Sequence, residues 1–114
     1  MTAPRWLDLA EYPFTSKWLT LPSGRLHYVD EGQGRPLVFV HGTPDWSFLW
    51  RGLIKALAPH YRCVAPDHLG FGLSDRPHGS WYLPENQAAN LRTLIERLEL
   101  RDVGVVTADH VARH

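Results

Sequence analysis

Two short segments combine glycine, histidine and acidic residues in a way that could support chemistry. Residues 41–51 (HGTPDWSFLWR) and residues 65–77 (APDHLGFGLSDRP) each follow or close a short apolar run. In open α/β sheets, ligands bind beyond the carboxyl ends of the strands, where a glycine such as Gly42 lets the backbone turn closely and leaves N–H groups facing an anion. The first segment therefore predicts an oxyanion or anion site.

A purely structural interpretation of the first segment remains open. In it, Gly42 and Pro44 only shape a turn, and Trp46 fills the core. The second segment weighs against this interpretation, because it is a further loop rich in Gly and Pro, without any period of its own, after a second predicted strand.

The elements that must position these loops alternate between strand and helix. Strand-like runs cover residues 17–21, 25–30, 37–40, 62–66 and 103–106, and helical spacing covers residues 47–60 and 85–100. The turn sequence Pro-Ser-Gly at residues 22–24 predicts an antiparallel hairpin. Residues 37–40 are apolar throughout, which is typical of a strand covered on both faces. The predicted fold class is therefore α/β: a mostly parallel sheet with an antiparallel N-terminal hairpin and helices on both faces.

Each predicted helix has an apolar face. The apolar residues are Leu49, Leu53, Ile54 and Leu57 in the first helix, and Leu91, Leu94, Ile95 and Leu98 in the second. Asp45 or Ser47 is available as the N-cap of the first helix.

The length of 114 residues suits a single domain. We divide it into an irregular N-terminal arm over residues 1–16, pinned to the surface by Trp6, Tyr12 and Phe14, and an α/β-type domain over residues 17–114.

Charge and cysteine content exclude several kinds of partner. Twelve Lys and Arg residues balance twelve Asp and Glu residues, so we expect no nucleic acid and no membrane surface as a partner. No run approaches the ~18 apolar residues of a membrane span. Cys63 is the single cysteine, and we expect it to be buried as a small apolar residue. Nothing in this composition requires an oxidising compartment, which favours a cytoplasmic location.

Taken together, the two loop segments resemble those after strands 3 and 4 of the α/β-hydrolase superfamily, and they are most similar to haloalkane dehalogenases and their relatives. The resemblance includes the LHYVDEG sequence at residues 26–32. It implies a partial α/β-hydrolase fold, a small-molecule substrate and hydrolytic substitution. In that reaction a carboxylate or serine after strand 5 attacks, and an acid-supported histidine then activates water. It implies no cofactor and no metal.

The resemblance also assigns roles to residues of the first loop. The backbone N–H of Thr43 would stabilise the oxyanion of the covalent ester intermediate. The Thr43 side chain stands where many dehalogenases place an Asn that holds the halide. Gly42 and Trp46 would line the same site.

Asp109 lies where the family carries its nucleophilic aspartate. His110 replaces the Trp expected beside a halide, and Val111 stands where a small residue, usually Gly, allows the sharp turn. A lone Asp after a strand also suits a solvated turn, so this alternative stays open.

The sequence ends at His114, and we expect a truncated chain without the late carboxylate and histidine of the family, with little or no activity alone. Two alternatives to a dehalogenase-like chain remain: a fragment of an epoxide or ester hydrolase, and a non-catalytic interaction fragment. The predicted strand at residues 103–106 would have one open edge, through which the chain could self-associate.

Overall fold

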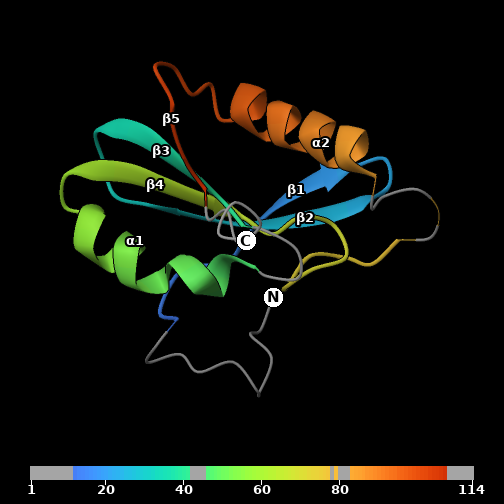
Figure 1. The fold of residues 1–114 in the computed structure, drawn as a ribbon, viewed down its shortest axis with the longest axis horizontal. Helices are drawn as coiled ribbons and strands as arrows, with labels where there is room; N and C mark the ends of the chain where they lie inside the picture. The colour runs from blue at the N-terminus through green and yellow to red at the C-terminus, as the bar shows by residue number, and fades with distance from the viewer. Residues whose placement is uncertain (1–11, 42–45, 78, 80–82, 108–114) are drawn as a thin grey trace, which may run out of the picture.

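The computed structural model describes residues 12–41, 46–77, 79 and 83–107, which form a sheet with helices on its two faces (Figure 1). The strands are β1 (Lys17–Leu21), β2 (Gly24–Glu31), β3 (Arg35–Val40), β4 (Tyr61–Pro66) and β5 (Gly104–Thr107). The helical elements are η1 (Ser47–Trp50), α1 (Arg51–Leu57) and α2 (Pro84–Arg97). This confirms the predicted α/β class and the predicted order of elements.

The five strands lie in the order β1-β2-β4-β3-β5. β2 is antiparallel to both of its neighbours, whereas β3 is parallel to β4 and to β5. Among the described strands, β2 alone therefore runs against the common direction. The carboxyl ends of β3, β4 and β5 meet at one edge of the sheet, and this is where the two loop segments begin.

Two apolar clusters lie on opposite faces of the sheet. Val38 and Phe39 are consecutive and both fully buried, because successive strand residues point to opposite faces. Phe39 packs in the cluster that includes Ile54 of α1, and Val38 packs in the cluster that includes Leu94 of α2. The continuous apolar run at residues 37–40 is thus explained by cover on both faces, as predicted.

The apolar face of the first helix differs from the prediction. Leu49 and Leu53 are exposed, at 36% and 45%, whereas Trp50 and Ile54 fill the core. The segment begins as the 3-10 turn η1 before it becomes α1, so its residues do not follow one helical period from the start.

The predicted capping by Ser47 is also wrong, because Trp46 is the N-cap of η1 and makes no side-chain cap hydrogen bond. The Ser47 side chain instead pairs with the Tyr12 hydroxyl. Asp45 lies outside the described residues. In α2 the predicted face is confirmed, since Leu94 is buried and Leu91, Ile95 and Leu98 pack beside it.

The segment before β1 contributes directly to the core. Tyr12 is fully buried, and its ring meets Phe14 edge to face at 5.1 Å between centroids. Trp6 lies outside the described residues. Cys63 is a free, fully buried thiol, as predicted, and burial raises its pKa to about 11.

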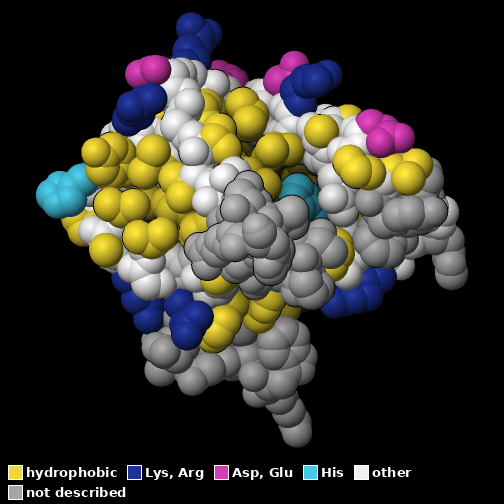
Figure 2. Space-filling view, in the orientation of Figure 1, with side chains coloured by type: hydrophobic (Ala, Val, Ile, Leu, Met, Phe, Trp, Pro, Cys, Tyr) yellow, Lys and Arg dark blue, Asp and Glu magenta, His cyan; other side chains and the backbone are white. Residues whose placement is uncertain are grey.

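β5 lies at one end of the described sheet, beside β3. Its Val105 side chain is 61% exposed. Apolar side chains gather on this face of the molecule over the region of β5, β3 and α1 (Figure 2). Within the described residues, no helix is long and apolar enough to cross a membrane.

Candidate functional site

The two loop segments are brought together at the carboxyl ends of β3 and β4. His41 directly follows β3, and Asp67 and His68 directly follow β4. The backbone N–H of His68 donates to Nε2 of His41 at 2.9 Å, and the two rings meet edge to face at 4.6 Å. Because Nε2 of His41 accepts, the proton of its neutral ring is on Nδ1.

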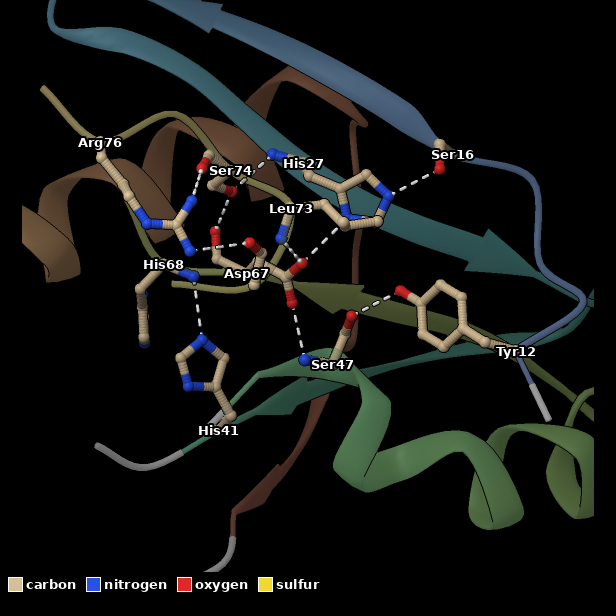
Figure 3. A network of polar contacts seen from close by, with 11 residues as sticks. Tyr12, Ser16, His27, His41, Ser47, Asp67, His68, Leu73, Ser74 and Arg76 are labelled. Carbon is tan, nitrogen blue, oxygen red and sulfur yellow. Dashed lines mark hydrogen bonds and ion pairs between the residues drawn. The ribbon is translucent and has the colours of Figure 1, made fainter. Parts of the chain in front are cut away.

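The Asp67 carboxylate connects three parts of the chain (Figure 3). It is fully buried. One oxygen accepts from the Ser47 N–H at 2.6 Å, and the other accepts from the Leu73 N–H at 3.0 Å and pairs with Nδ1 of His27 at 3.0 Å. A carboxylate removed from water is costly unless donors replace the lost hydration, and three donors do so here.

Ser74 also links the loop after β4 to strand β2. Its hydroxyl donates to the Asp67 carbonyl at 2.6 Å and accepts from the His27 N–H at 2.7 Å, so both roles of the hydroxyl are satisfied. The Asp67 N–H donates to the His27 carbonyl at 2.8 Å. The loop after β4 is therefore fixed to β2 by side-chain and backbone bonds.

Gly72 is required by the same arrangement. Its φ is +54°, and a Cβ at this position would lie 2.5 Å from Oδ2 of Asp67 and 2.8 Å from the Trp46 ring. Only glycine accommodates both the conformation and the close approach.

The end of the loop is tied to β2 by a pair of charged residues. Asp75 accepts from the Arg25 N–H at 2.8 Å and pairs with the Arg25 guanidinium at 3.3 Å. The backbone hydrogen bond first, and the guanidinium second, lower the pKa of Asp75.

Trp46, in the first loop segment, takes part in an aromatic stack. Its ring stacks on Phe48 at 5.4 Å and on Tyr12 at 5.6 Å. The Tyr12 hydroxyl pairs with Ser47 at 2.5 Å, and burial raises the pKa of Tyr12 above its ordinary value. The Trp46 ring is thus partly buried and is fixed by this stack.

His68 is held as a neutral ring. Burial first, and the neighbouring His41 second, lower its pKa to about 4. At neutral pH such an imidazole carries no charge and is a weak base.

The other predicted site residues, Gly42, Thr43, Asp109 and His110, lie outside the described residues. The strand ends that lead to them are described. Val40 pairs with Thr107 in the parallel register of β3 and β5. These paired residues precede Gly42 and Asp109 by two positions each.

Asp67, His27 and Ser74 were not singled out from the sequence, although they organise this edge. Two signals were available. Asp67 is a polar residue directly after an apolar strand, and His27 shares a strand face with the buried Val29. Within the described part of the chain, no group of three or more His, Cys, Asp or Glu side chains could hold a metal ion.

Known proteins of similar sequence include haloalkane dehalogenases and a decarboxylase. A haloalkane dehalogenase 2 of Mycobacterium bovis is 51% identical over 89 residues, covering 78% of this chain and 31% of its own length. A cis-3-alkyl-4-alkyloxetan-2-one decarboxylase of Shewanella oneidensis is 42% identical over 92 residues, covering 79% of this chain and 29% of its own length.

Solved structures give the same result. The haloalkane dehalogenase DatA of Agrobacterium tumefaciens C58 superposes with a TM-score of 0.76 at 34% identity, over 84% of this chain and 33% of that one. A Bacillus megaterium epoxide hydrolase superposes with a TM-score of 0.74 at 32% identity, over 82% of this chain and 33% of that one.

The chain therefore spans about a third of the length of these relatives. A family model described as the alpha/beta hydrolase fold matches residues 35–109, which include β3, η1, α1, β4, α2 and β5. The predicted resemblance is confirmed, and this chain belongs to the alpha/beta hydrolase fold family.

Proposed function

We propose that this chain carries the front part of the site of a haloalkane dehalogenase-like hydrolase, which acts through an aspartyl ester with Asp109 as the nucleophile. The observation that carries the proposal is the similarity to haloalkane dehalogenase 2, at 51% identity over 89 residues. The parallel pairing of Val40 with Thr107 supports it, because the oxyanion segment and the nucleophile segment then leave the sheet from neighbouring strand ends.

The proposed reaction has two steps. A carboxylate oxygen of Asp109 attacks the carbon that bears the leaving group, so a C–O bond forms and the bond to the leaving group breaks. Water then attacks the ester carbonyl, the backbone N–H of Thr43 stabilises the oxyanion, and the alcohol product leaves as the Asp109 carboxylate is restored. Gly42, Trp46 and His110 would line the space around the substrate.

The second step needs a base that takes a proton from water. His68 is unsuited to this, because its pKa is lowered to about 4. The relatives extend beyond the region that matches this chain, and we assign the base to residues of that further region. Residues 1–114 are then expected to support formation of the ester but not its hydrolysis.

Thr43 and His110 stand where many dehalogenases carry an Asn and a Trp that hold the halide, so two groups that would bind a halide leaving group are replaced. An epoxide is the alternative substrate, and the similarity to the Bacillus megaterium epoxide hydrolase favours it. Opening an epoxide leaves an alkoxide on the ester intermediate. This alkoxide needs a proton, whereas a released halide needs an anion-binding site.

A panel of haloalkanes, epoxides and activated esters tests this proposal on the folded chain, with Asp109→Asn as the matched variant. We expect no sustained turnover, and one equivalent of halide or opened epoxide per chain, which Asp109→Asn abolishes. Sustained turnover by Asp109→Asn would contradict the assignment of the nucleophile.

A second candidate function is association of two copies through the edge of β5. The exposed Val105 side chain and the terminal place of β5 in the described sheet favour it. Size-exclusion chromatography over a range of concentrations tests this: a concentration-dependent dimer is expected, and a monomer at high concentration would contradict it.

The proposal includes a cytoplasmic location, which the free buried Cys63 supports. Fractionation of cells that express the chain is expected to place it in the cytoplasm, and recovery from the membrane or the medium would contradict this.

A further inference from the structure

Three side chains form a hydrogen-bonded line that the proposed Asp109 chemistry does not use. Ser16 precedes β1, His27 lies in β2, and Asp67 follows β4. The Ser16 hydroxyl lies 3.0 Å from Nε2 of His27, and Nδ1 of His27 lies 3.0 Å from Oδ2 of Asp67. Figure 3 shows Ser16 on the far side of His27 from Asp67, and well apart from His41 and His68.

The contacts of Asp67 fix the direction of these hydrogen bonds. Backbone N–H groups of Ser47 and Leu73 can only donate, and they converge on the two carboxylate oxygens together with His27. Asp67 therefore acts as an acceptor, so Nδ1 of His27 carries the proton. In the neutral ring, Nε2 then carries a lone pair, which accepts the Ser16 hydroxyl proton at 3.0 Å.

The imidazole is held firmly in this orientation. The His27 side chain is fully buried, and its ring meets the edge of Trp18 at 5.0 Å between centroids. Its backbone N–H and carbonyl are bonded to Ser74 and Asp67. A general base that needs no reorganisation before it accepts a proton is the arrangement that activates a serine hydroxyl.

The serine itself is accessible, unlike the two residues behind it. Ser16 is half-buried, and its chain neighbours Thr15 and Lys17 are exposed. The line thus runs from a buried carboxylate and a buried base to a half-buried serine, which is the distribution expected of a nucleophile.

We propose that Ser16 is a second nucleophile of this chain, activated by His27 and Asp67, which reacts with activated acyl or phosphonyl donors. With a fluorophosphonate, the Ser16 oxygen attacks phosphorus while its proton moves to Nε2 of His27. The O–P bond forms, the P–F bond breaks and fluoride leaves; the imidazolium, stabilised by Asp67, then returns its proton to water. This site is independent of Asp109.

Labelling of the folded chain with a fluorophosphonate, followed by peptide mass mapping, tests the proposal. The exposed Ser23, in the turn between β1 and β2, serves as an internal reference for an ordinary hydroxyl. We expect one label per chain on Ser16, lost in Ser16→Ala and retained in Ser23→Ala. Absence of a label on Ser16, or labelling no faster than on Ser23, would overturn the proposal.

The role of the base is tested separately with His27→Gln, whose folding is checked by circular dichroism. Loss of a general base is expected to slow labelling of Ser16 by about 10²-fold or more. If this variant does not fold, the ¹⁵N shifts of His27 in the wild-type chain decide. A neutral ring with the proton on Nδ1 supports the proposal, and a proton on Nε2 overturns it.

Ser16→Ala should leave alkylation at Asp109 unchanged, so failure of the Ser16 site is distinguishable from failure of the Asp109 site.

Discussion

At the residue scale, the Asp67 carboxylate has the largest share in shaping the candidate site. It joins the start of η1, the loop after β4 and strand β2 through Ser47, Leu73 and His27. Its removal would leave buried donors without an acceptor, and such losses cost more than the hydrogen bonds themselves contribute.

Asp67→Asn is therefore expected to lower the free energy of unfolding by about 3–5 kcal/mol, since one oxygen acceptor becomes an amide that faces donors. Urea denaturation measures this change in the free energy of unfolding. Asp102→Asn is the matched control, because the Asp102 side chain is 84% exposed and Asn also accepts its positive φ. Equal effects of the two substitutions would contradict the role assigned to Asp67.

Gly72→Ala and Gly52→Ala are expected to change stability in opposite directions. Gly72 has φ +54° and no room beside Asp67, so Ala there should destabilise the fold by at least ~1–2 kcal/mol. Gly52 lies within α1 with nothing within 4 Å of an added Cβ, so Ala there should stabilise by about 0.5–1 kcal/mol. Thermal melts of both variants check the two signs, and stabilisation by Gly72→Ala would show that the loop geometry is wrong.

The lowered pKa of His68 predicts a pH dependence of stability. The unfolded ring titrates near pH ~6.5, whereas the folded ring titrates at about 4. Between these values the unfolded chain binds more protons, so the contribution of neutral His68 is fully present above pH ~6.5 and is lost as the pH falls toward 4.

His68→Gln should flatten the curve of unfolding free energy against pH within that window, as measured by urea denaturation at several pH values. His60→Gln, at an exposed turn, provides a comparison that leaves the His41–His68 contact intact. A slope unchanged by His68→Gln would contradict the burial of this ring.

At the element scale, the strands could be predicted because their signals are local. The fully apolar run of residues 37–40 and the Pro-Ser-Gly turn each specify their structure within a few residues, and β3 and the β1–β2 hairpin follow them. The face of the first helix could not be predicted in the same way. It depends on the 3-10 start at η1 and on Ser47, whose hydroxyl is bonded to Tyr12, 35 residues earlier in the chain.

Dependence on tertiary contacts also explains why His27 and Asp67 were not predicted as site residues. His27 and Asp67 are 40 residues apart, and only the pairing of β2 with β4 brings them into contact. The place of Trp46 beside the first loop was accessible from sequence, whereas its stack on Tyr12 and Phe48 depends on tertiary packing.

The edge strand β5 yields a prediction at this scale. Val105→Lys adds a charge beside an apolar strand edge, which is expected to weaken self-association while changing stability little, because Val105 is 61% exposed. Leu53→Lys on α1, at 45% exposure, is the control for a general gain in charge. Sedimentation velocity compares the two; equal weakening by both variants would exclude the β5 edge as the specific contact.

At the scale of the whole molecule, the described residues form a mixed five-stranded sheet with helices on both faces, and the candidate site lies at the carboxyl ends of β3 and β4. The chain spans about a third of the length of its dehalogenase and epoxide hydrolase relatives. Two chemistries are proposed for it: ester formation at Asp109, and acylation or phosphonylation at Ser16.

The most direct test of the central claim is peptide mass mapping after incubation of the folded chain with a reactive primary haloalkane. We expect one alkyl group, attached as an ester to Asp109, cleaved by mild alkaline treatment and absent from Asp109→Asn. An unmodified Asp109 in a folded sample, or alkylation that persists at the same level in Asp109→Asn, would contradict it.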